Sequence, residues 1–165
     1  MCSQIREQTP ADVLGLMRGI GEGLGRRGWL LRSGGAEGAD SAHEAGCDLA
    51  GGAKEIYLPW KRFRKNPSPL FLPSPEAVAL AAATHPAWEK CSRGARLLHA
   101  RNCHQALGKK LDDPVSLVVC WTMGGGVRGG TATAMRLAAA RGARVVNLFE
   151  ETWDWSIADE LERAA

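Results

Sequence analysis

The most constraining feature of the sequence is a nearly continuous apolar run, VSLVVCW, from Val115 to Trp121. A strand with apolar side chains on both faces is typical of the centre of a parallel sheet that helices cover on both sides. Shorter runs at 29–32, 55–58 and 144–149 also have strand character. Parallel neighbours need a long crossover, usually a helix. The sequence therefore predicts an α/β fold with a mainly parallel sheet.

Helices are expected between these strands. Apolar residues recur at helical spacing over 11–28, with Thr9 as the cap and Pro10 in the first turn. Further helices are predicted at 40–50, about 75–83, about 86–107, about 130–141 and 152–164, and an irregular basic, proline-rich connection at 61–75. The whole chain, 1–165, is predicted to be a single Rossmann-like domain. Only MCSQIRE is available for a first strand before the first helix.

Composition narrows the functional class. The 165 residues are 45% hydrophobic and 24% charged, and the net charge of +3 permits an anionic partner without indicating nucleic acid. Five cysteines without metal-like spacing indicate reduced thiols, most of them in the core. No apolar run reaches the roughly 20 residues of a membrane helix. We therefore expect a cytoplasmic protein with no membrane partner and no cofactor.

Two glycine-rich stretches each follow a strand and begin a helix. They are LRSGGAEGAD at 31–40 and MGGGVRGGT at 123–131. In a parallel sheet such turns share the carboxyl edge, where backbone N–H groups at a helix start attract anions. Neither stretch is a G-x-G-x-x-G or a Walker A motif. In the second stretch, Arg128 is the basic residue best placed for a phosphate, and Thr131 is either a hydroxyl donor or an N-cap.

Several single residues carry alternative interpretations. Asp40 either complements a helix dipole or holds a ribose hydroxyl. Glu44, four residues on, is a general base or part of a solvated helix face. Arg101 and Asn102 could bind a phosphate and a base, or could only satisfy neighbouring loops. Trp60 is placed either in the core or where it would stack on a base.

A metal site is not expected. His99 and Cys103 have the i, i+4 spacing of metal ligands, but the sequence shows no further ligand converging on them. The basic run at 61–65 indicates either a solvated loop or a contact for a nucleic-acid backbone.

Motifs along most of the chain resemble the SLOG superfamily, and in particular small phage and prophage proteins similar to DNA-processing protein A (DprA). The resemblance lies in LRSGGAEGAD, in HPAWEKCSRGARLLHARNCHQALGK at 85–109, and in the pairs and triplet Trp121-Thr122, Gly129-Gly130-Thr131 and Asn147-Leu148. It implies a Rossmann-like fold with a nucleotide-type ligand at the carboxyl edge. In the related LOG enzymes a Pro-Gly-Gly-x-Gly-Thr-x-x-Glu motif assists cleavage of an N-glycosidic bond. This chain departs from that register, with Glu44 as the nearest substitute.

Three functions follow from these motifs. The first is capture of a nucleotide-derived compound, such as an ADP-ribose derivative or a cyclic nucleotide signal, by a phage protein that senses or sequesters a host defence signal. The second is a LOG-like nucleotide N-ribohydrolase, with Glu44 and Arg101 as catalytic candidates. The third is DprA-like binding of single-stranded DNA, which is less favoured. The oligomeric state is open, and a homo-oligomer fits the tryptophan-bearing C-terminal segment. The predicted ligand-binding residues are Arg32, Ser33, Gly34, Gly35, Gly38, Asp40, Trp60, Arg101, Asn102, Arg128, Gly129, Gly130 and Thr131.

Overall fold

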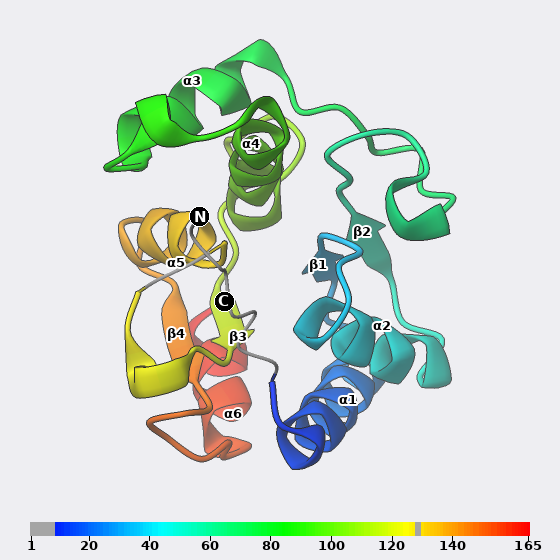
Figure 1. Ribbon diagram of the computed structural model, residues 1–165. Coiled ribbons are helices and arrows are strands. Elements are labelled where there is room, and N and C mark those ends of the chain that lie inside the picture. The colour runs from blue at the N-terminus through cyan, green and yellow to red at the C-terminus, as the bar shows by residue number, and fades with distance from the viewer. Residues whose placement is uncertain (1–8, 128–129) are drawn as a thin grey trace.

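Helices alternate with short parallel strands in the computed structural model, which describes residues 9–127 and 130–165 (Figure 1). The mixed α/β class predicted from the sequence is confirmed. In chain order the elements are α1 (Ala11–Arg26), β1 (Leu31–Ser33), α2 (Ala39–Leu49), β2 (Lys54–Ile56), α3 (Pro75–Thr84), α4 (Arg93–Leu107), β3 (Leu117–Cys120), α5 (Ala132–Ala139), β4 (Arg144–Asn147) and α6 (Ser156–Ala164). Short 3₁₀ turns lie at Phe63–Lys65, Trp88–Lys90 and Met123–Gly125.

The strands form two separate parallel pairs. β1 pairs with β2 in the register Leu31↔Lys54, and β3 pairs with β4 in the register Leu117↔Arg144. In the described residues β1 and β3 are not hydrogen-bonded to each other, and residues of both line a cavity of about 1330 Å³. The one continuous sheet predicted from the sequence is therefore not observed. The segment before α1, which was the only room for a further strand, lies largely outside the described residues.

Helices α1 and α2 pack closely because a glycine of each helix lies against the backbone of the other helix. A Cβ at Gly46 would overlap the carbonyl of Arg18, and a Cβ at Gly21 would overlap the carbonyl of His43. The α1 helix is confirmed, but its predicted cap is wrong. Pro10, rather than Thr9, holds the N-cap position, and its carbonyl accepts a hydrogen bond from the Leu14 N–H (3.0 Å).

Helices α3, α4 and α5 enclose the main hydrophobic core. Its buried members are Ala77, Ala81, Ala100, Cys103, Ala106, Leu107, Leu137 and Ala138. The helix predicted from about residue 86 is wrong at its start, because Ser92 caps α4 by accepting a hydrogen bond from the Ala95 N–H (3.3 Å). A polar cap of this kind satisfies a free amide of the first turn and fixes the helix start.

Helix α6, at the C-terminal end of the chain, contacts the end of α1 and the residues that follow it. Asp159 forms an ion pair with Arg27 at the end of α1 (2.8 Å), and Glu162 accepts a hydrogen bond from the Trp29 indole (2.7 Å). The C-terminal segment therefore packs against the N-terminal half of the same chain. None of the helices in the described residues is long and apolar enough to cross a membrane.

Candidate functional site

The first glycine-rich loop runs from Ser33, at the end of β1, to Ala39, at the start of α2. Gly35 and Gly38 adopt positive φ angles of 64° and 99°, which residues with a Cβ seldom adopt. The Asp40 carboxylate accepts a hydrogen bond from the Ala36 N–H (3.1 Å) and so closes the loop on the first turn of α2. Both interpretations of Asp40, as a residue of the helix start and as a ligand contact, remain compatible with this position.

Arg101 reaches this loop from α4. Its guanidinium lies against Gly34, where a Cβ would overlap Nη1, and Nη1 lies 3.5 Å from an Asp40 carboxylate oxygen. The residue is 6% exposed, and its Nε is buried without a hydrogen-bond partner in the described part of the chain. Burial lowers the pKa of Arg101, and the charges of Asp40 and Glu44 partly oppose this shift. A charged group in this state is incompletely compensated.

The second glycine-rich loop follows β3. Asn102 of α4 donates a hydrogen bond to the carbonyl of Gly130 and thereby fixes the end of this loop. Thr131 occupies the N-cap position of α5, as one interpretation of the sequence had it, but its hydroxyl makes no capping bond to the described residues. The predicted contacts Arg128 and Gly129 lie outside the described residues.

Thr122 and Asn147 hold the start of the second loop, and the sequence analysis gave neither a role in the site. Asn147 is 5% exposed. Its amide donates hydrogen bonds to Thr122 Oγ1 (2.7 Å) and to the Gly125 carbonyl (3.1 Å), and its Oδ1 accepts one from the Thr122 N–H (3.2 Å). The signal was present, since both residues belong to the pairs Trp121-Thr122 and Asn147-Leu148 quoted in the sequence analysis.

The larger cavity brings together eight of the predicted ligand contacts. These residues are Arg32, Ser33, Gly38, Asp40, Arg101, Asn102, Gly130 and Thr131. They come from both glycine-rich loops and from α4, which passes between the two strand pairs (Figure 1). The cavity, at about 1330 Å³, exceeds the roughly 300–1,000 Å³ of a typical small-molecule site because it continues along the gap between β1 and β3.

Arg32 differs from the other predicted contacts that line this cavity. Its guanidinium is engaged by Glu55 (2.9 Å) and Asp113, so its charge is already paired. Trp60 is 41% exposed and packs edge-on against Phe63. Trp60 is not among the described residues that line the larger cavity or the smaller pocket described next.

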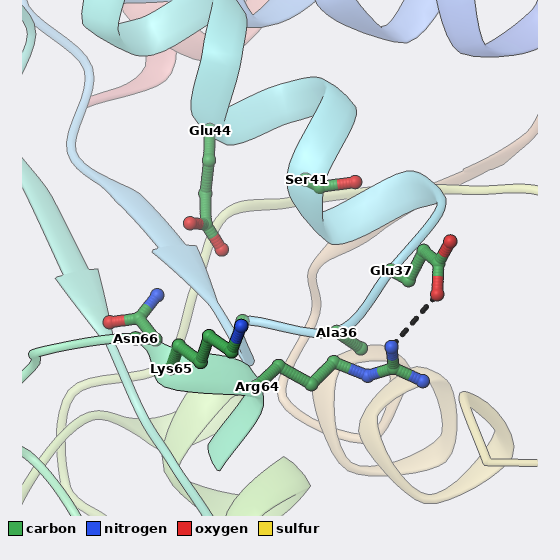
Figure 2. A pocket seen from close by; sticks show the side chains of 8 residues that line it. Ala36, Glu37, Ser41, Glu44, Arg64, Lys65 and Asn66 are labelled. Atoms are coloured by element: carbon green, nitrogen blue, oxygen red, sulfur yellow. Dashed lines mark hydrogen bonds and ion pairs between the residues drawn. The ribbon is translucent and has the colours of Figure 1, made fainter. Parts of the chain in front are cut away.

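A second, smaller pocket of about 330 Å³ lies between the first loop and the basic run (Figure 2). It is lined by Gly35, Ala36, Glu37, Ser41, Glu44, Arg64, Lys65 and Asn66. Arg64 forms an ion pair with Glu37 (2.8 Å), which ties the basic run to the glycine-rich loop. Arg62, Arg64 and Lys65 all have positive φ angles, of 57°, 49° and 63°. Strained backbone of this kind is concentrated at functional sites and tight turns.

Glu44 extends from α2 into this smaller pocket (Figure 2). Its carboxylate accepts a hydrogen bond from Ser33 Oγ (2.6 Å). Burial raises the pKa of Glu44 above its ordinary value, and the Ser33 hydrogen bond opposes this. Glu44 therefore lines the smaller pocket and Arg101 the larger cavity, and the two spaces share the lining residues Ala36, Glu37, Ser41 and Arg64.

Comparisons of the chain with models of protein families, with curated proteins and with solved structures find no match. The function of the site is therefore inferred from the residues that form it.

Proposed function

We propose that this chain binds a nucleotide-derived small molecule in the larger cavity, with a phosphate group beside Arg101. The supporting observation is the Arg101 guanidinium, which is buried at the cavity wall and, among the described residues, has one long ion pair and an Nε without a partner. Arginine binds phosphate oxygens through paired, charge-assisted hydrogen bonds. A phosphate would supply the compensation that Asp40 alone gives only in part.

The surroundings of Arg101 suit the rest of such a ligand. The first turn of α2 lines the same cavity with Ala39 and Asp40 and presents the positive end of the helix dipole there. Asp40 is placed to accept a hydrogen bond from a ribose hydroxyl, and Asn102 adjoins the second loop. An ADP-ribose derivative or a cyclic nucleotide combines these groups.

The position of Glu44 favours one second candidate, hydrolysis of an N-glycosidic bond, because the carboxyl lines a pocket and burial raises its pKa, the direction that suits a general acid. Against this, Glu44 lines the smaller pocket and not the larger cavity, whereas Arg101 lines the larger cavity and not the smaller pocket. Capture without cleavage is therefore the function that we propose first.

The test is calorimetry of the purified chain with ADP-ribose, cyclic mononucleotides and cyclic dinucleotides, followed by mass spectrometry of the recovered ligand. We expect one compound to bind and to be recovered intact. Arg101→Met should weaken binding by about 10-fold or more, since a hydrogen bond to a charged group contributes about 1.5–3 kcal/mol. The matched control is Arg93→Met, an exposed arginine at the start of the same helix.

Each alternative result has a distinct meaning. Release of a free base from a nucleoside monophosphate would support the hydrolase instead. Binding only to single-stranded oligonucleotides, with strong salt dependence, would support a DNA-binding function. Absence of binding to all of these compounds, or equal binding by Arg101→Met, would contradict the proposal.

A further inference from the structure

Three metal-binding side chains converge on the side of α4 where the α3–α4 connection and α5 meet it. His85 follows α3, Cys91 follows the 3₁₀ turn Trp88–Lys90, and His99 lies in α4. One donor atom from each lies within 4.8 Å of the others, and all three residues are half-buried. The sequence analysis paired His99 with Cys103 instead. Cys103 is fully buried in the core, and its thiol contacts the His99 carbonyl (3.6 Å).

We propose that His85, Cys91 and His99 form a zinc site with three protein ligands and one open coordination position. Zinc takes thiolate sulfur at about 2.3 Å and imidazole nitrogen at about 2.0–2.1 Å in tetrahedral geometry, which places the two donor atoms about 3.5 Å apart. The Cys91 sulfur lies 3.8 Å from His85 Nδ1, so a small closing movement completes this pair. The imidazole rings of His85 and His99 are 4.3 Å apart between centroids.

Cys91 and His85 can both take the form that zinc requires. The Cys91 thiol is not in a disulfide and would lose its proton on binding zinc. His85 Nδ1 accepts a hydrogen bond from the Ala87 N–H (3.2 Å), so this nitrogen is unprotonated, and it faces the thiol. A zinc ion bound at Nδ1 would replace the hydrogen bond from Ala87.

The surroundings also resemble those of a metal ligand set. Thr133 of α5 lies with its hydroxyl 3.0 Å from His99 Nδ1, which leaves Nε2 for a metal ion. Histidine ligands are commonly oriented by a hydrogen bond at the other ring nitrogen. The Trp88 ring packs against His85 on one side of the cluster, and Arg96 lies over the same ring. Thiolate and imidazole together favour zinc over magnesium or calcium.

Binding of zinc here would join the segment 85–91 to α4 and, through Thr133, to α5. Three protein ligands and an open position are the arrangement of catalytic rather than closed structural zinc sites. Because the ligands do not line the larger cavity in the described structure, this proposal is independent of the nucleotide-binding proposal.

The test uses the tag-free, reduced chain after removal of metals by a chelator. Titration with Co²⁺ should give the intense visible bands of a tetrahedral site and a thiolate-to-cobalt charge-transfer band, saturating at one ion per chain. Zn²⁺ should abolish both. Cys91→Ser should lose the charge-transfer band, and Cys91→Ser and His99→Ala should each lose more zinc affinity than the about 10–100-fold that an outer hydrogen-bond partner costs.

Two further variants separate coordination from packing. Thr133→Val, which keeps the shape of the side chain and removes its hydroxyl, should weaken zinc binding by about 10-fold. Cys47→Ala, a buried cysteine of α2, should bind as the unaltered chain does. No cobalt spectrum from the unaltered chain, or an unchanged one from Cys91→Ser, would overturn the proposal. If Cys91→Ser fails to fold, X-ray absorption of the zinc-loaded unaltered chain identifies the atoms that coordinate zinc. Coordination without a sulfur atom would contradict the proposal.

Discussion

The Arg101 guanidinium lies 3.5 Å from the Asp40 carboxylate and so connects α4 to the first glycine-rich loop. The two partners are not equally buried, because the side chain of Arg101 is 7% exposed and that of Asp40 is 24% exposed. A substitution that removes one charge of the pair leaves the other charge to be stabilised by water at its present position. Water reaches the Asp40 carboxylate more readily than the Arg101 guanidinium.

Substitutions at this ion pair should therefore have unequal effects on stability. Asp40→Asn leaves a buried guanidinium without a counter-charge, and breaking a buried pair in this way costs about 3 kcal/mol. Arg101→Met leaves a partly solvated carboxylate, for which we expect about 1 kcal/mol or less. Urea unfolding of both variants measures the difference. Equal losses, or a larger loss in Arg101→Met, would contradict this account of the pair.

Addition of the bound nucleotide should then act differently on the two variants. In Asp40→Asn a phosphate beside Arg101 supplies the missing negative charge, so the ligand should raise the melting temperature more than it does in the unaltered chain. In Arg101→Met the ligand should have little effect. This pattern links the ion pair to the proposed site.

Gly34 is predicted to be required for the position of Arg101. Gly34→Ala places a Cβ where Arg101 Nη1 now lies, so the guanidinium must leave the loop. We expect a loss of about 1–3 kcal/mol in stability, as for other overpacked sites, together with loss of ligand binding. The matched control is Gly19→Ala, because nothing lies within 4 Å of a Cβ there and Gly19 is inside α1. That control should gain up to about 1 kcal/mol from helix propensity. Retained binding by Gly34→Ala would show that Arg101 has room to move.

Stability should fall as the pH is lowered, because of His43. Burial lowers the pKa of His43 from 6.5 to about 4, and its Nε2 is buried without a partner among the described residues. Since the folded pKa lies below the unfolded one, the unfolded chain binds the proton first, between pH 6.5 and about 4. Stability is therefore complete above pH 6.5 and decreases below it, by roughly 2 kcal/mol at pH 5.

The measurement is the urea-unfolding free energy at several pH values for the unaltered chain and for His43→Leu. The difference between the two should change over the interval from pH 6.5 to 4. The lowered pKa of His99 acts in the same direction and is common to both proteins, so it cancels in the difference. A constant difference across this interval would mean that His43 titrates normally.

The sequence was most informative about local structure and least informative about how strands assemble. The helix at 11–28 and the apolar strand at 115–121 were recognisable because their side-chain periodicity reflects burial, and both were found as α1 and β3. The gap between β1 and β3 could not be foreseen, since strand pairing depends on backbone hydrogen bonds between distant segments. Likewise, nothing in the spacing of His85, Cys91 and His99 indicates that the turn Trp88–Lys90 brings them together.

The two glycine-rich loops and α4 line one cavity, and their association was predicted for a related reason. Glycines after strands indicate the carboxyl edge from sequence alone, and α4 was singled out because the stretch 96–105 is dense in functional side chains. That Arg32 is neutralised by Glu55 and Asp113 depends on tertiary contacts, which the sequence pattern does not encode.

Asn147 provides a final prediction, because its amide and carbonyl have different partners. Asn147→Asp keeps the shape and the accepted bonds but loses the two donated bonds, to Thr122 Oγ1 and the Gly125 carbonyl. At pH 7 a buried carboxylate would face these two oxygens, so we expect a loss of about 2–4 kcal/mol relative to the unaltered chain. The new carboxyl should have a raised pKa, so this loss should shrink toward pH 5 as the group gains a proton and can donate once.

Asn66→Asp is the control, since its Oδ1 only accepts a bond from the Ser68 N–H (3.0 Å), which aspartate retains. Urea unfolding of both variants at the two pH values measures the effect, and a loss in Asn147→Asp that is small or independent of pH would mean that the second loop does not depend on this amide.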